Sequence, residues 1–382
     1  MFVFLLISPT LFFSFFWHRF SLQIKKIFSI LYLFFLITLF TGFYLNGYDW
    51  SVYYLSLSND ESSGYFEVGF VFLFKAILFV AGGNFGISIF IYYLIIFSSL
   101  FYFLNKKNVN LPFFITAMLL VFGYNLILEQ LRQFIACVII FYAVIKLEEN
   151  RNYKGKYILL CIFSSLFHVS SLVMIPALYL VEIKSSNKFK LLSILAVFSI
   201  CIFLSLSSSI LLGLSDLSFV FNKLSNYIDK SPVVVNFGLL NVIDLFFVVF
   251  YLFFNKKIDE NEYMGFYARF IFLGALIHFF SGSIPFLSRL SYYFYFVVIY
   301  VFSMSVCKNG IRYMKIRDNK TLLVSIFFFV FTMANYTSYF RNMNAPIDFF
   351  TMNIYLPDVF YENYVNELAI EKFQSAASFL DK

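Results

Sequence analysis

Charged residues are scarce in this chain. Of its 382 residues, 13% are Asp, Glu, Lys or Arg, whereas 61% are hydrophobic and 23% aromatic. Soluble globular domains hold about 25% charged residues, so this chain has too little polar surface to cover a water-soluble body of its size. The composition therefore excludes a cytosolic enzyme and a disordered chain, and it indicates a protein that spans a membrane many times.

Residues that ligate metals or form disulfides are also few. The chain has three histidines and four cysteines, with no CxxC pair. The cysteines lie far apart in apolar runs, at Cys137, Cys161, Cys201 and Cys307. We therefore expect no disulfide framework, no metal site and no cofactor.

Twelve apolar runs hold most of the hydrophobic residues. A membrane span needs about 20 such residues, and none of the runs alternates with period two, so helices are expected rather than barrel strands. The runs are 2–17, 27–45, 67–82, 86–104, 111–128, 131–147, 157–181, 191–212, 237–254, 263–280, 290–307 and 321–338.

Basic residues set the orientation of these runs. Nineteen of the 28 Lys and Arg residues fall in six clusters that can all lie on the cytoplasmic side, where the ends of membrane spans collect positive charge. The clusters are Arg19/Lys25/Lys26, Lys106/Lys107, Lys146/Arg151/Lys154/Lys156, Lys184/Lys188/Lys190, Lys256/Lys257 and Lys308/Arg312/Lys315/Arg317/Lys320. The net charge of +7 thus reflects orientation, and no nucleic-acid partner is expected.

Two runs cannot be full spans under this orientation. Run 157–181 has a basic cluster at each end, so it should be a re-entrant or short-helix hairpin with His168 at its tip. Run 67–82 should start and end outside, as a re-entrant or interfacial helix. The expected fold class is an all-α polytopic membrane protein with about ten full transmembrane helices and two re-entrant or short-helix segments.

Longer polar stretches suggest how the chain is divided. We expect a single transmembrane domain, 1–338, with outer loops 46–66 and 213–236, and an external C-terminal tail, 339–382. The end of the tail predicts a surface amphipathic helix, because side chains of one face recur with i, i+3, i+4, i+7 spacing. These side chains are Tyr361, Tyr364, Val365 and Leu368.

Ionisable side chains at membrane depth or at its outer boundary are costly in lipid, so each is a candidate for function. They are Asp49, Glu67, Lys75, Glu129, Arg132, His168, Asp244, Arg269, His278 and Arg289. Most of them belong to the outer half of the predicted topology, so a functional site is expected there. Arg269 has a simpler explanation as the ion-pair partner of Asp244.

Arg132 and His168 are the strongest candidates. Glu129, Arg132 and Gln133 would share a face if their segment is helical. Either Glu129 closes the turn through a salt bridge, or Arg132 binds an anion, because its planar fork matches two phosphate oxygens. A lone His is commonly a core residue, but at an irregular backbone next to a water-filled cavity it can act as a base.

The remaining candidates have two interpretations each. Asp49 and Glu67 flank the first outer loop, where they are either solvated loop residues or part of a site. The aromatic residues around them fit a membrane-interface belt or a surface that stacks on sugars. Arg289 begins a span from outside, where an arginine commonly snorkels to the interface.

Five short motifs follow one another along residues 40–300. They are Asp49-x3-Tyr53, Tyr65-x-Glu67-x-Gly69, Leu131-Arg132-Gln133-x2-Ala136, Phe167-His168-x-Ser170-Ser171 and Arg289-x2-Tyr292-Tyr293. Together with the predicted spans, this ordered set resembles the EpsG-like branch of the bacterial Wzy-type O-antigen and capsule polymerases. One position departs from the family pattern, since Val68 stands where a proline is common.

The resemblance implies an enzyme, a glycosyltransferase-type polymerase of the bacterial inner membrane with its active site facing the periplasm. Donor and acceptor would both be undecaprenyl-diphosphate-linked oligosaccharides, and a chain-length regulator is a candidate partner. On this hypothesis Arg132 and Arg289 bind the diphosphate, and His168 is the general base or orients the acceptor. Asp49 and Glu67 hold the acceptor sugar or supply the base. Supporting residues would be Glu129, Gln133, Tyr53, Tyr292 and Tyr293.

Other classes of membrane protein stay open. A flippase or transporter of lipid-linked sugars usually shows internal repeats and helices broken by Gly or Pro, whereas this chain has 15 Gly, 7 Pro and no repeat of fixed period. A membrane O-acyltransferase acting on polysaccharide would also use a histidine, and a structural membrane subunit would use none of these residues. The sequence does not decide the sugars, the linkage or the anomeric outcome.

Overall fold

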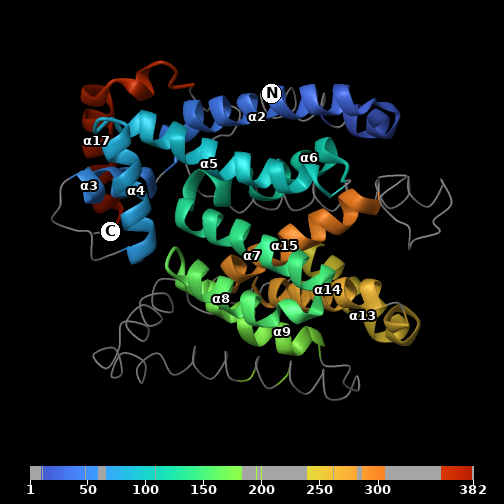
Figure 1. Ribbon diagram of the computed structural model, residues 1–382. Coiled ribbons are helices and arrows are strands. Elements are labelled where there is room, and N and C mark those ends of the chain that lie inside the picture. The colour runs from blue at the N-terminus through green and yellow to red at the C-terminus, as the bar shows by residue number, and fades with distance from the viewer. Residues whose placement is uncertain are drawn as a thin grey trace. The chain divides into compact units, whose positions relative to one another are not determined.

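The structure is a computed structural model that describes residues 10, 12–47, 49–58, 66–107, 109–182, 195, 199, 239–260, 262–281, 286–305 and 354–380. Every regular element within these ranges is a helix, as the sequence predicts (Figure 1). The chain divides into two compact units, of which the first is Met1–Leu172 with Ile299–Lys382 and the second is Val173–Val298.

The long helices of the first unit coincide with predicted apolar runs. They are α2 (Leu22–Phe43), α5 (Phe85–Asn105) and α7 (Leu131–Glu149). Two helical segments, Leu22–Asn46 and Phe85–Asn105, are long and apolar enough to cross a membrane, and six further apolar helices of the described part are shorter. Run 321–338, nearly all of run 191–212 and most of run 2–17 lie outside the described residues, so the ten spans stay a prediction.

The helix expected to be re-entrant or interfacial is short. α4 (Val68–Val80) has 13 residues and is therefore about 20 Å long, less than the roughly 30 Å of a bilayer's hydrocarbon core. Before it comes α3 (Asp49–Ser58), also short. Phe72 and Phe79 on α4 are 78% and 87% exposed, which leaves an apolar face for lipid to cover.

Two other predicted runs are interrupted. Run 111–128 consists of α6 (Leu111–Phe122) followed by a π-helical turn, η4 (Gly123–Glu129). Run 157–181 consists of α8 (Lys154–Ser165), a 3-10 turn η6 (Val169–Val173) and α9 (Met174–Glu182). Both interruptions fall beside candidate residues, η4 before Arg132 and η6 after His168. Turns of these two kinds redirect the backbone within a helical run.

The second unit contains a pair of antiparallel helices. α13 (Leu239–Asp259) and α14 (Glu262–Ser281) are joined by a short turn and pack along their length. Their contact is apolar, with Val248, Tyr251, Phe272 and Ala275 at its centre. α15 (Phe286–Ser305) follows and begins in this unit.

The end of the tail forms the predicted helix, α17 (Glu362–Leu380), which packs on α3 in the first unit (Figure 1). The face that it buries agrees with the predicted one only at Val365 and, in part, at Leu368. Val365 and Ala369 are fully buried, whereas Tyr361 is 60% exposed and Tyr364 is 37% exposed. The tyrosines were assigned to the apolar face by their spacing, but small side chains allow the closer approach to α3.

Polar contacts fix the tail at both ends of this contact. The Asn84 amide donates to the Phe360 carbonyl (2.8 Å), and the carboxylate of Glu362 accepts from the backbone N–H of Phe85 (3.1 Å), at the start of α5. Further along, the ammonium of Lys372 donates to the carbonyls of Leu45 (2.6 Å) and Gly47 (2.9 Å). The same ammonium lies 5.7 Å from the ring centre of Trp50.

The attachment of the tail requires a glycine at position 86. A Cβ there would lie 2.0 Å from the Val359 carbonyl oxygen, a distance that no packing can accommodate. Trp50 is buried in the structure, with 1% of its surface exposed. We predict that Gly86→Ala detaches α17, exposes Trp50 to water and shifts its fluorescence emission to longer wavelength. Measured in a Trp17→Phe background, this emission comes from Trp50 alone. Gly155→Ala is the matched control, because a Cβ at Gly155 meets nothing within 4 Å, and an unchanged spectrum in Gly86→Ala would contradict the prediction.

The attachment should also depend on pH through Lys372. Burial lowers the pKa of Lys372 from 10.5 to about 8, although Glu129 and Glu371 act to raise it. The detached amine binds its proton up to about pH 10.5, whereas the attached amine releases it near pH 8, so attachment strengthens as pH rises between these values. We expect the Gly86→Ala chain to regain part of the short-wavelength Trp50 emission over this window. Lys372→Met should remove the pH response.

Candidate functional site

Arg132 owes its position to a break in the helix before it. The π-turn η4 ends at Glu129, and Gln130 takes a non-helical conformation with φ −107° and ψ 62°. A new helix, α7, then begins at Leu131. Arg132 is the second residue of α7. Its side chain therefore starts at the end of a helix and not in the middle of a span.

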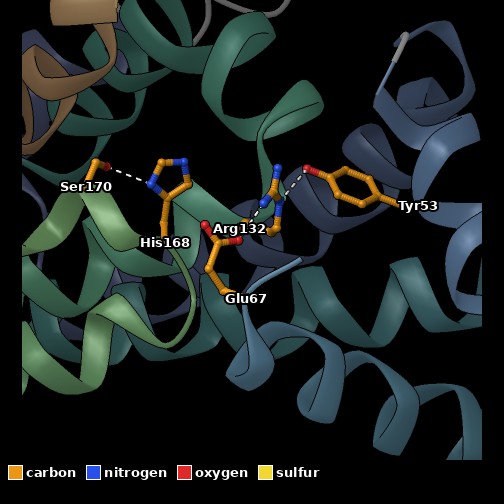
Figure 2. Close-up of polar contacts among 5 residues, drawn as sticks. All are labelled: Tyr53, Glu67, Arg132, His168 and Ser170. Atoms are coloured by element: carbon orange, nitrogen blue, oxygen red, sulfur yellow. Dashed lines mark hydrogen bonds and ion pairs between the residues drawn. The ribbon is translucent and has the colours of Figure 1, made fainter. Parts of the chain in front are cut away.

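The guanidinium of Arg132 is held by residues from two other segments, α3 and the residues just before α4. We call Tyr53, Phe66, Glu67 and Arg132 the arginine cluster, and Figure 2 shows the polar contacts of Arg132 with Glu67 and Tyr53. Nη1 donates to Glu67 Oε2 at 2.5 Å, and Nε donates to the Tyr53 hydroxyl at 3.4 Å. The ring of Phe66 lies 4.8 Å from the guanidinium carbon. The Arg132 side chain is 18% exposed, so the ion pair is largely shielded from water.

This arrangement leaves part of the guanidinium for a ligand. An arginine carries five N–H donors, and the hydrogen bonds within the described residues use Nε and Nη1 of Arg132 only. Nη2 has no hydrogen-bond partner in that part of the chain. Glu67 and Tyr53 thus fix the orientation of the fork while one edge stays available to an anion.

Glu67 is brought to the segment of His168 by a close backbone contact. The N–H groups of Gly69 and Phe70, in the first turn of α4, donate to the Leu166 carbonyl at 2.9 and 3.3 Å. A Cβ on Gly69 would lie 2.7 Å from Leu166 Cβ and 2.9 Å from that carbonyl oxygen. Glycine is therefore required where α4 meets the turn after α8.

His168 lies outside both helices of its run, between α8 and η6. Its Nδ1 is 2.7 Å from the hydroxyl of Ser170, and its backbone N–H donates to Ser164. Figure 2 shows the Glu67 carboxylate between the imidazole of His168 and the guanidinium of Arg132. The prediction that His168 occupies an irregular backbone position thus agrees with the structure.

Glu129 has a different position from the one predicted. The break at Gln130 separates it from Arg132, so the two do not share one helical face. Its carboxylate, 9% exposed, instead accepts from the backbone N–H of Asp49 at 2.9 Å, the first residue of α3. A Cβ on Gly47 would lie 2.9 Å from the same carboxylate. Glu129 therefore stabilises the start of α3, where a negative charge is favourable, and the side chain of Asp49 is exposed.

The other predicted site residues fall into two groups. Gln133 is fully buried on α7, one residue beyond Arg132. Arg289, Tyr292 and Tyr293 lie on α15 in the second unit, so the arginine cluster is described without them.

An acid–histidine pair that the sequence did not predict lies in the second unit. The sequence predicts that Arg269 pairs with Asp244, and this prediction is wrong. Arg269 pairs with Asp259 and also donates to the Val181 carbonyl. Asp244 pairs with His278, whose Nδ1 is 2.6 Å from Asp244 Oδ2. Within the described residues, no group of three or more His, Cys, Asp or Glu side chains could hold a metal ion.

The contact at Gly69 gives a test of this geometry. We predict that Gly69→Ala lowers the thermal stability of the detergent-solubilised protein by about 1–3 kcal/mol, because overpacking forces the backbone of α4 away from Leu166. Gly155→Ala, in the open first turn of α8, is the control and should not lower it. Equal melting temperatures for the two variants would show that the close contact does not exist.

Comparisons with known proteins agree with the resemblance seen in the motifs. The family model described as the EpsG family matches residues 26–350. No curated protein and no solved structure matches the chain. The family match includes every residue of the arginine cluster, His168 and the second unit. Because the match extends over most of the sequence, the chain belongs to the EpsG family.

Proposed function

We propose that this protein is a polysaccharide polymerase that joins lipid-linked oligosaccharide repeat units at the outer face of the bacterial cytoplasmic membrane. EpsG family membership supports a polymerase-type function in polysaccharide biosynthesis. The apolar helices support a membrane protein whose substrates carry lipid tails. The observation that carries the proposal is Arg132, a shielded guanidinium with one edge available to an anion.

The reaction needs stabilisation of a leaving diphosphate. The acceptor hydroxyl attacks the anomeric carbon of the donor sugar, the bond from that carbon to the diphosphate oxygen breaks, and undecaprenyl diphosphate leaves with the electron pair. A guanidinium fixed in advance stabilises this developing charge without reorganisation, which is most effective where water is excluded. Arg132 is proposed for this role, and the diphosphate-binding role of Arg289 stays a prediction from the sequence.

Glu67 and Tyr53 are proposed as positioning residues. Glu67 accepts from Arg132 Nη1, so its carboxylate is committed to the guanidinium rather than to an acceptor proton. Burial raises the pKa of Tyr53, so its hydroxyl stays protonated at neutral pH. Both side chains thus keep the fork of Arg132 in one orientation, which a flexible side chain would not keep alone.

His168 and Asp49 are proposed to bind the acceptor sugar. The Nδ1 of His168 is 2.7 Å from the hydroxyl of Ser170, and this contact orients the imidazole. Asp49 has an exposed side chain at the start of α3. The basic clusters support an outer position for the arginine cluster and Asp49, at the end away from the cytoplasm.

A deletion strain complemented with variants tests this proposal. Complementation with the wild-type chain should restore a ladder of polymer lengths, whereas the deletion strain should make product with a single repeat unit. We predict that Arg132→Lys reduces polymer by 10²-fold or more at normal protein levels, because lysine keeps the charge but loses the fork. Glu67→Gln should shorten the ladder less, since its amide oxygen can still accept from Arg132.

Arg151→Lys is the matched control, since this arginine lies in the 3-10 turn before α8 on the predicted cytoplasmic side and should keep a full ladder. A full ladder from Arg132→Lys would remove Arg132 from the site. Loss of the single-repeat product in the deletion strain would indicate transport rather than polymerisation. An unchanged ladder in that strain would exclude the proposed function.

A further inference from the structure

Two neighbouring tyrosines of α5 hydrogen-bond to the backbone on either side of the break at Gln130. The Tyr93 hydroxyl donates to the carbonyl of Ile127, in the π-turn η4, at 2.9 Å. The Tyr92 hydroxyl donates to the carbonyl of Leu131, the first residue of α7, at 2.6 Å. One long helix thus holds both sides of the break, and none of the roles proposed above uses either tyrosine.

The hydroxyls, rather than the rings, need an explanation at these two positions. Tyr92 is 1% exposed and Tyr93 is fully buried, in a chain that has 59 Phe against 28 Tyr. Phenylalanine would fill the same space without a polar group, and a buried hydroxyl is unfavourable unless it is hydrogen-bonded. Two adjacent tyrosines therefore indicate that their hydroxyls have a use at the break.

The break creates the backbone groups that these hydroxyls satisfy. The end of a helix leaves carbonyls that have no partner inside that helix, and Ile127 is among the last residues of η4. Buried carbonyls are nearly always paired, so the bond from Tyr93 removes a cost of ending the helix there. The bond from Tyr92 fixes the direction in which α7 leaves the turn at Gln130.

The same hydrogen bonds oppose a straight helix through this segment. In a continuous helix the carbonyls of residues 127 and 131 would point along the helix axis, toward N–H groups one turn further on. Both tyrosine hydroxyls would then be buried without these acceptors, which is unfavourable. A π-turn is uncommon and is found mostly at functional sites, and here two side chains of another helix stabilise it.

Arg132 directly follows Leu131 in the chain, so its backbone moves with the carbonyl that Tyr92 holds. α5 and α7 pack against each other within the first unit (Figure 1). We infer that Tyr92 and Tyr93 are positioning residues for polymerisation, because they hold the break from which Arg132 reaches the diphosphate. The inference rests on the proposed function and adds to it two residues that act through Arg132.

Initial rates of the purified full-length chain in detergent test the inference, with the lipid-linked repeat unit extracted from the deletion strain as substrate. Tyr92→Phe and Tyr93→Phe should each lower kcat by about tenfold or more with little change in KM, because the charge that Arg132 stabilises develops only as the diphosphate leaves. Tyr102→Phe is the matched control on the same helix. Tyr102 is 65% exposed and its hydroxyl accepts from Lys106, so this variant should keep the wild-type rate.

A second substitution, at Arg132, separates this role from a general role in packing. In the Arg132→Lys chain, assayed with more protein, Tyr92→Phe or Tyr93→Phe should change the rate by less than about twofold, because the fork is already lost. Equal rate losses with and without Arg132→Lys would overturn the inference in favour of packing.

Two separate side chains make the hydrogen bonds, so each variant tests the inference independently. Should one variant fail to accumulate, the other decides. Failure of both to accumulate would also overturn the inference, because the hydroxyls would then serve the fold as a whole.

The two proposals fail in different ways. A wild-type chain that makes no polymer from the extracted repeat unit would refute the proposed function. A wild-type chain that polymerises while Tyr92→Phe and Tyr93→Phe keep the full rate would refute only the role of the two tyrosines.

Discussion

The ion pair of Arg132 and Glu67 is the interaction around which the first unit is organised. A guanidinium shielded from water needs a partner, because an unpaired charge in apolar surroundings is several kcal/mol unfavourable. Glu67 comes from the segment before α4 and Arg132 from the start of α7, so the pair fixes the distance between two elements far apart in sequence. The break at Gln130 and the aromatic rings of Phe66 and Tyr53 then complete the surroundings of the guanidinium.

Backbone contacts through glycine set the second constraint. Gly69 lets α4 reach the Leu166 carbonyl, and Gly86 lets α5 reach the backbone at Val359. Each contact joins an apolar helix to an irregular segment, and in each case a side chain would occupy the space of the partner's backbone. The site therefore depends on residues that contribute no functional group of their own.

The sequence predicted the helices well and the pairings poorly. Helix positions follow from the length of the apolar runs, which is why α2, α5, α7, α13 and α14 lie where expected. Arg132 and Glu67 were both predicted as site residues. Their ion pair was not predicted, because periodicity and spacing relate side chains within one element and not side chains of separate elements. The pairing of Asp244 with His278 could have been predicted from the sequence. Asp244 lies 15 residues before the end of α13 at Asp259, and His278 lies 16 residues after the start of α14 at Glu262. An antiparallel hairpin brings such positions to the same level. The hydrogen bonds from Lys372 to backbone carbonyls could not be predicted, because nothing in the sequence distinguishes this lysine from one that is exposed to water.

The packing of α17 on α3 has a consequence for how the protein is divided. The family match ends at residue 350, yet the buried face of α17, with Val365 and Ala369, lies beyond it. A boundary drawn from sequence similarity would separate α3 from the helix that covers it. The compact unit thus extends beyond the residues that the family model matches, and its last helix lies directly on the segment that carries Asp49 and Tyr53.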